Sequence, residues 1–156
     1  MTGANFSSWF NNAQGTIYAD ATTYMDVTNT ANRTDTVTIS EGTATTNSML
    51  LGVNTVGSAN VMYLYTLANG SAQVDLQLAL SSGSYKTSYA YKVNDFALCL
   101  NGGSATTDGN GIVPNSVNQM WIGSRFNSSQ HQNGTIKKIA YYPIRVTNTQ
   151  LQALTS

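Results

Sequence analysis

Residues 134–156, GTIKKIAYYPIRVTNTQLQALTS, contain two hydrophobic patterns separated by Pro143. Apolar residues crowd the stretch before the proline, which predicts a strand that ends there because proline cannot donate a hydrogen bond to a sheet. After the proline, Thr147 and Gln150 have the spacing of a capping box, and two leucines follow one helical turn apart. The segment therefore predicts a final strand, a stop and one short helix within residues 147–154.

Runs of β-branched and aromatic residues recur upstream of this segment, separated by clusters of Gly, Asn and Ser. This spacing of short runs is typical of an all-β sandwich, and no long helical pattern is visible before Thr147. In residues 73–80, apolar residues occupy every second position, which indicates a strand with one buried face. We predict nine strands, at residues 16–21, 35–40, 48–53, 60–67, 73–80, 85–93, 95–101, 119–124 and 134–143.

The strand predicted at residues 95–101 follows a turn at residues 93–95 and forms a hairpin with the preceding strand. Its alternation places large apolar residues on one face and Ala97 and Cys99 on the other, outward face. Cys99 is the only cysteine, and its apolar neighbours favour a small buried residue over a reactive thiol. The residues predicted to be buried together are Phe96, Leu98, Leu100, Ile139 and Leu151.

Composition limits the partners of the chain. At 156 residues it has the length of one domain, and its formal net charge is zero with only 9% charged residues. Neither nucleic acid nor an anionic membrane surface is an expected partner, because both require a basic patch. No apolar run approaches the ~20 residues needed for insertion across a membrane. Asn, Ser and Thr supply the polarity instead, which suits neutral hydrogen bonding.

Four segments carry a resemblance to a known family. SYAYKVNDFALCLNGG (residues 88–103), MWIGS (120–124) and residues 133–156 resemble the C-terminal domains of bacteriophage tail-fibre and related virion proteins. More distantly they are similar to laminin-G-like, concanavalin A-like jelly rolls. NFSSWFNNAQGTIYADA (5–21) resembles the opening strand pair of the same phage domains, so the resemblance covers most of the chain.

The resemblance implies a fold and a location. The fold is a concanavalin A-like or laminin-G-like jelly-roll β-sandwich of two antiparallel sheets with one short C-terminal helix. Residues 1–156 would form a single domain of this kind in the C-terminal part of a longer protein. The expected location is the extracellular phage particle, in a tail fibre or surface appendage, with other virion subunits as partners. Fibres of this family are commonly trimeric.

An enzyme is not predicted. Glycosidic cleavage generally needs two carboxylates facing each other across the bond, and hydrolases of this fold carry them as Glu-x-Asp-x-x-Glu along one strand. The only glutamate, Glu41, stands beside a glycine where a turn is expected, and Asp75 and Asp95 belong to different strands. No nucleophile elbow or phosphate loop is present.

No cofactor is expected, with one alternative left open. TTDGNGIVP contains Asp108 and Asn110, whose oxygens are of the kind that calcium takes. Asp-Gly and Asn-Gly are first of all turn signals, so a turn is favoured over calcium.

Candidate binding residues gather in polar stretches. Trp121 alternates with Met120 and Ile122 and is predicted to point away from them, toward an outer face or rim. The tyrosine pairs at 63/65 and 89/91 each share a strand face, and for both pairs core packing is favoured over a sugar platform. Arginines and amides in polar loops are the remaining candidates. The predicted carbohydrate-binding residues are Trp121, Arg125, Asn127, Gln130, His131, Arg33 and Asp35.

These observations favour a non-catalytic distal virion domain that binds a host-surface glycan. Sugars present hydroxyls and flat apolar faces, which amides, aromatic rings and few formal charges can recognise. A purely structural decoration or oligomerisation module is the alternative, and a glycoside hydrolase or depolymerase is the third.

Overall fold

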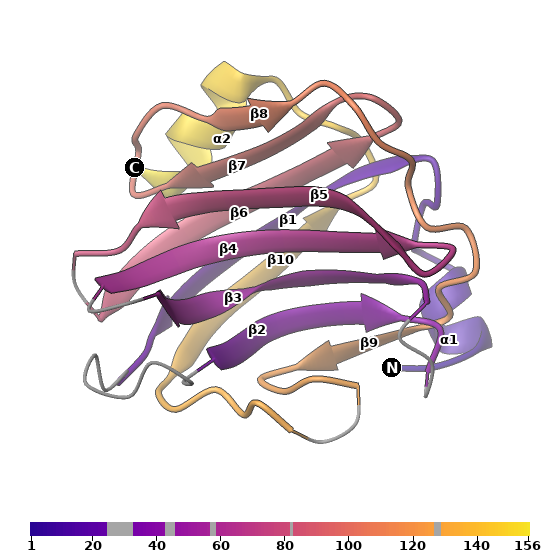
Figure 1. Cartoon of the computed structure of the whole chain (residues 1–156), viewed down its shortest axis with the longest axis horizontal. Coiled ribbons are helices and arrows are strands. Elements are labelled where there is room, and N and C mark those ends of the chain that lie inside the picture. Colours follow the sequence, from indigo (N-terminus) through magenta and orange to yellow (C-terminus); the bar gives the residue numbers. More distant parts are fainter. Residues whose placement is uncertain (25–32, 43–45, 57–58, 82, 127–128) are drawn as a thin grey trace.

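Two five-stranded antiparallel sheets pack face to face in the computed structural model, which describes residues 1–24, 33–42, 46–56, 59–81, 83–126 and 129–156 (Figure 1). The front sheet of Figure 1 has the order β5-β4-β3-β2-β9, and the back sheet has the order β10-β1-β6-β7-β8. The predicted fold class, a laminin-G-like jelly roll with a short C-terminal helix, is confirmed.

All nine predicted strands are present, and two short elements are additional. The additional strand β8 has three residues and the helix α1 has four, too few for either to show a periodicity in the sequence. Among the described residues, neither helix is long and apolar enough to cross a membrane. The elements are α1 (Ala4–Ser7), β1 (Gln14–Thr22), β2 (Arg33–Ser40), β3 (Ser48–Val56), β4 (Ala59–Ala68), β5 (Ser71–Ala79), β6 (Ser84–Lys92), β7 (Phe96–Leu100), β8 (Thr106–Asp108), β9 (Gln119–Ile122), β10 (Ile136–Tyr142) and α2 (Asn148–Thr155).

The main core lies between the two sheets. Alternate residues of each strand point inward, so Leu64 of the front sheet and Leu98 of the back sheet belong to one buried cluster. Phe96 and Leu100 join this cluster as predicted, and Ile139 packs against it while partly buried. The core prediction for Tyr89 and Tyr91 is also confirmed.

The helix α2 forms a second, smaller core on the outer face of the back sheet. Leu151 lies there with Ala97 and Cys99, so the prediction that it packs with Phe96 and Leu98 is wrong. Ala97 and Cys99 lie on the face of β7 that points away from the main core, as predicted, but α2 covers this face. The prediction that Cys99 is a small buried residue is confirmed. Small side chains let the helix approach closely, and the buried Cys99 Sγ lies 3.3 Å from the hydroxyl of Thr155.

The N-terminus of α2 has the predicted capping box. The Gln150 backbone N–H donates to Thr147 Oγ1 at 3.3 Å, and the Thr147 N–H donates to Gln150 Oε1 at 2.8 Å. Replacing Thr147 by alanine is expected to lower the free energy of unfolding by about 1 kcal/mol, the usual effect of losing an N-cap. Denaturant melts measure this, with the exposed Thr107→Ala as the control expected to stay within about 0.5 kcal/mol. Equal losses in both variants would contradict the prediction.

Candidate functional site

The outer face of the front sheet is not covered by another sheet or by α2 (Figure 1). One row of side chains crosses it, because directly paired residues on neighbouring strands share a face. Met120 is buried in the core, so its neighbour Trp121 points outward as predicted, and its ring is half-buried. The row, in strand order, is Trp121, Thr38, Leu50, Tyr65 and Asp75.

Beside this row lies a group of four side chains that we call the Arg–Asp cluster: Arg33, Asp35, Tyr63 and Arg125. Asp35 is fully buried, and its Oδ2 accepts a hydrogen bond from Arg125 Nε at 2.7 Å. Its Oδ1 accepts a hydrogen bond from the Tyr63 hydroxyl and lies 3.5 Å from Arg33 Nε. The Arg33 guanidinium lies over the Tyr63 ring, 4.0 Å from its centroid, and donates to the Tyr63 hydroxyl at 2.7 Å.

The backbone places Asp35 by means of a bulge in β2. The pairing of β2 with β3 shifts register between Asp35 and Val37, opposite Gly52. A Cβ on Gly52 would collide with the carbonyl oxygen of Thr34, so this position requires glycine. The Asp35 N–H donates to the carbonyl oxygen of Gln130 at 2.9 Å, which joins the loop after β9 to the bulge.

Two guanidinium groups facing one carboxylate give the Arg–Asp cluster a surplus positive charge. Burial raises the pKa of Asp35 above its ordinary value, although both arginines oppose this shift. Burial also lowers the pKa of Arg33, and the neighbouring charge of Arg125 lowers it further. Among the described residues, Nη2 of Arg33 and Nη2 of Arg125 are buried without a hydrogen-bond partner. Their side chains remain 25% and 17% exposed, so the cluster presents positive charge to solvent, where an anionic group could approach it.

The structure brings together part of the predicted set. Strand β2 begins at Arg33, two residues before the predicted strand at residues 35–40, so Arg33 belongs to a strand and not to a polar loop. Arg33 and Asp35 meet Arg125, which is distant in the sequence. Gln130 contributes its backbone carbonyl, and its side-chain Oε1 is buried without a partner in the described part of the chain. His131 is exposed to solvent. Asn127 lies outside the described residues.

Two tyrosines of the site were predicted to be core residues. Tyr63 is buried and Tyr65 is partly buried, but neither belongs to the core between the two sheets. Tyr63 and Tyr65 lie on the outer face, because Met62 and Leu64 of the same strand take the inner face. Alternation separates the two faces of a strand but does not say which one is buried when both carry large side chains. The polar hydroxyl of each tyrosine was the only signal in the sequence that favoured the outer face.

The other carboxylates singled out in the sequence have local roles. Glu41 accepts hydrogen bonds from the backbone N–H groups of Thr46 and Asn47. Hydrogen bonding to the side chains of Thr46 and Asn47, and less to their backbone, lowers the pKa of Glu41. Asp108 Oδ1 accepts the N–H of Asn110 at 2.9 Å, as in a turn. Within the described ranges, no three His, Cys, Asp or Glu residues gather as a metal site would require. Calcium at Asp108 and Asn110 stays a prediction.

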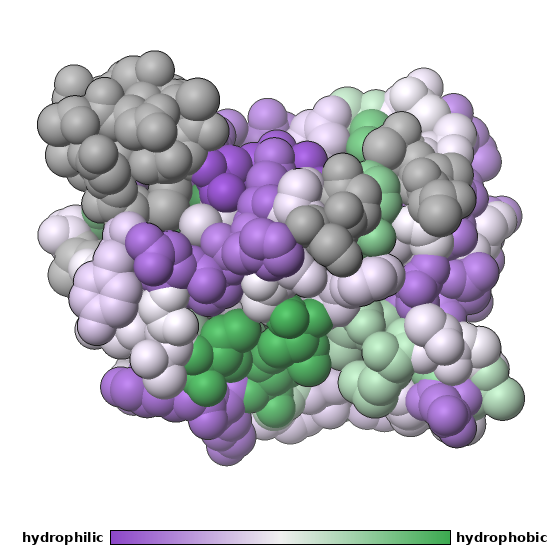
Figure 2. Space-filling view, turned by 90° about the horizontal axis from the view of Figure 1, so that it is seen from below, coloured by the Kyte–Doolittle hydropathy of each residue, from purple (hydrophilic) through white to green (hydrophobic). Residues whose placement is uncertain are grey.

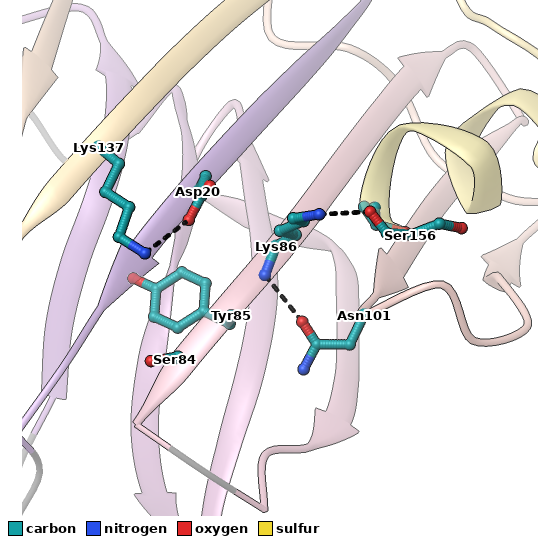
Figure 3. Close-up of a pocket in the computed structure, with 8 residues that line it drawn as sticks. Asp20, Ser84, Tyr85, Lys86, Asn101, Lys137 and Ser156 are labelled. Carbon is teal, nitrogen blue, oxygen red and sulfur yellow. Dashed lines mark hydrogen bonds and ion pairs between the residues drawn. The ribbon is translucent and has the colours of Figure 1, made fainter.

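A polar pocket of about 370 Å³ lies on the outer side of the back sheet, beside the end of α2 (Figure 3). Its charged groups bind one another: Lys137 Nζ is 3.9 Å from Asp20 Oδ1, and Lys86 Nζ donates to the carbonyl oxygen of Ser156. The Lys86 backbone N–H donates to Asn101 Oδ1 at 2.8 Å. The pocket therefore has fewer charged groups free to bind a charged ligand than the Arg–Asp cluster has.

Comparison with known proteins shows the fold of the chain. No protein-family model matches the sequence, and no curated protein does. One similar solved structure is the carbohydrate-binding module CBM40 of the Ruminococcus gnavus IT-sialidase, bound to α2,3-sialyllactose. The two structures have a TM-score of 0.72 and 17% sequence identity, and the match covers 96% of this chain and 86% of that one. A leech intramolecular trans-sialidase aligns with 97% of this chain and 24% of its own length, at a TM-score of 0.69 and 16% identity.

Domains LG4-5 of the mouse laminin α1 chain are also similar, with a TM-score of 0.56 and 8% identity over 88% of this chain and 37% of that chain. The chain thus has a jelly-roll fold that carbohydrate-binding modules and laminin G domains share.

Proposed function

We propose that this domain binds an acidic glycan on the outer face of its front sheet and does not cleave it. The observation that carries the proposal is the Arg–Asp cluster, in which one buried carboxylate faces two partly exposed guanidinium groups and leaves them with a surplus positive charge. Fork-shaped guanidinium groups bind carboxylates in two-point contacts. A module of the same fold is bound to sialyllactose, a sugar that carries one carboxylate, and this agrees with an acidic ligand.

The neighbouring row of side chains supplies the apolar part of such a site. Trp121 and Tyr65 are half-buried at two points of this row, on strands β9 and β4. Rows on one face of a strand are about 7 Å apart, which is comparable to the width of a sugar ring. Thr38 and Leu50 of the row are buried, so the rings of Trp121 and Tyr65 are its accessible apolar groups. A carboxylate held by Arg33 and Arg125 would place the rest of the glycan near these rings, where its flat apolar face can stack.

The same geometry supports binding without hydrolysis. In the part of the chain that the structure describes, Asp35 and Asp75 are the carboxylates on this face, and three strand spacings separate β2 from β5. At about 4.8 Å per spacing the two groups are some 14 Å apart, farther than the ~5 to 9.5 Å that glycosidic cleavage uses. Asp35 is also fully engaged by its own arginines.

The resemblance of residues 88–103, 120–124 and 133–156 to tail-fibre domains extends the proposal to a biological setting. In that setting the domain is the distal part of a phage fibre, and the glycan belongs to the surface of the host. Calcium is not required by the proposed contacts.

Binding of 3′-sialyllactose, measured by calorimetry, is expected to exceed binding of lactose, which lacks the carboxylate. Arg125→Lys keeps the positive charge but loses the fork, so it should weaken sialyllactose binding by about 10- to 100-fold. Arg145→Lys is the matched control, since Arg145 lies after β10 and pairs with Asp95 at 2.7 Å. This variant should bind as the unmodified protein does.

Equal affinity for lactose and sialyllactose would contradict the proposal of an acidic ligand and would favour a neutral glycan instead. Failure of the domain to bind any member of a glycan array or whole host cells would favour the structural alternative. Release of reducing ends from host polysaccharide would favour a depolymerase.

A further inference from the structure

Strand β10 has an edge that pairs with no other described strand. It is the terminal strand of the back sheet and pairs only with β1. The neighbouring edge of β9 is different, because residues Met1 and Gly3 cover it through hydrogen bonds to Met120 and Asn118. An unpaired strand edge is a template for another extended chain unless it is protected.

The edge of β10 is flanked by apolar surface on both sides of the sheet. Figure 2 shows the hydrophobic surface on the side of the molecule where β9 and β10 come together. We call this hollow of about 330 Å³ the lateral patch; it is lined by Met1, Trp9, Met120, Ile122, Ile139 and Tyr141. A second apolar hollow of about 400 Å³ lies beside α2 and is lined by Tyr142, Ile144, Val146, Gln150, Ala153 and Leu154.

The other long edge strand, β5, lacks these features. Its exposed residues are small or polar, namely Ser71, Ala72, Asp75, Gln77 and Ala79. Next to β10, by contrast, Ile122 and Ile144 are 51% and 53% exposed. Exposed apolar side chains gathered along a free edge mark a contact surface.

We propose that β10 pairs with β10 of a second copy of this chain, antiparallel and about a two-fold axis at Ala140. The regular part of the strand fixes this centre. A bulge at Lys137 interrupts the pairing with β1 at one end, and Pro143 ends the strand at the other. The five residues between them, 138–142, have Ala140 at their middle.

This register is complementary to itself, as a two-fold contact must be. It places Ile139 opposite Tyr141 of the second copy, on the side of the lateral patch, and Lys138 opposite Tyr142 of the second copy. Lys138 already lies 5.8 Å from the ring of Tyr18, and the new neighbour offers the same kind of cation–π contact. The aliphatic stem of the lysine would cover the hollow beside α2.

Charge also favours this register and this partner. With Ala140 at the centre, the two copies of Lys138 are four residues apart along the paired strands, about 14 Å, which is beyond the ~8 Å screening length in physiological salt. Placing the two-fold axis at Ile139 would halve the distance between the two copies of Lys138, to within the screening length, where they would repel each other. The chain has a formal net charge of zero, so two copies meet without overall repulsion.

A cysteine at the two-fold axis tests the register directly. Residues that face each other across an antiparallel pair have Cα atoms about 4.5 to 5.5 Å apart, within the range of a disulfide. Oxidised Ala140→Cys is therefore expected to run as a covalent dimer on a non-reducing gel. Ala79→Cys, at an exposed position of the other long edge strand, is the matched control and should stay monomeric. The native Cys99 is buried and does not interfere.

Sedimentation of the unmodified protein should give twice the 16.7 kDa of one chain. Ile122→Glu should shift it toward monomer, whereas Val93→Glu, a change at an equally exposed valine in the turn after β6, should not. A monomer at every concentration, equal crosslinking of the two cysteine variants, or the mass of a trimer would overturn the proposal. Glycan binding is measured separately, so either proposal can fail alone.

Discussion

Leu98→Ala is expected to lower the free energy of unfolding by about 2 to 5 kcal/mol, the usual cost of truncating a core leucine. Leu98 is completely buried on β7 and lies in the core cluster between the two sheets. Removing its side chain leaves a cavity that rigid strands on both sides cannot fill. Urea or guanidinium melts of the two proteins measure the difference.

Two variants calibrate this result. Leu98→Met keeps most of the volume and should cost less than about 1.5 kcal/mol. Val93→Ala removes an exposed side chain in the turn before the same strand and should change stability by no more than about 0.5 kcal/mol. A Leu98→Ala midpoint equal to that of the unmodified protein would mean that this face of β7 is not the core.

The positions of the strands along the sequence could be predicted because each strand leaves a local signal. Alternation along residues 73–80 and turn residues such as Asn94, which has a positive φ of 56°, act over a few positions. The capping box of α2 is equally local, since Thr147 and Gln150 are three residues apart. Hydrophobic period and turn chemistry together suffice for a sandwich of short strands.

Contacts between distant elements left no such signal. Ala97 and Cys99 look like the outward face of a strand, and only the docking of α2 buries them. The outward position of Tyr63 likewise depends on which face meets the back sheet. Small residues are buried under a helix, and Tyr63 is buried outside the core between the sheets, so the size of a residue does not say where it is buried.

The site was predicted as separate residues and not as a cluster. Arg33, Asp35 and Arg125 each appeared as a polar candidate, but their pairing depends on the bulge in β2 and on Gly52. A bulge shifts the register by one residue and turns a side chain in a different direction. The alternating pattern of a strand does not predict this change. The cluster therefore became visible only with the strands in place.

Asp35→Ala is expected to lower the free energy of unfolding by about 3 to 5 kcal/mol, the usual cost of removing one partner from a buried ion pair. Asp35 is fully buried, and its loss leaves the guanidinium groups of Arg33 and Arg125 facing each other without the charge between them. The Tyr63 hydroxyl also loses its acceptor. Thermal and denaturant melts measure the effect.

Asp20→Ala is the matched control, because Asp20 makes a longer ion pair of 3.9 Å with a lysine that is 59% exposed. Exposed pairs of this kind contribute about 1 kcal/mol or less, so Asp20→Ala should be nearly neutral. Equal and small losses in both variants would show that the carboxylate of Asp35 does not hold the arginines.

Where Asp35→Ala still folds, it should also bind 3′-sialyllactose at least about 10-fold more weakly, because two arginines that repel each other no longer present a fixed pair of forks. If this variant binds 3′-sialyllactose as tightly as the unmodified protein does, the arrangement of the Arg–Asp cluster is not needed to recognise the glycan.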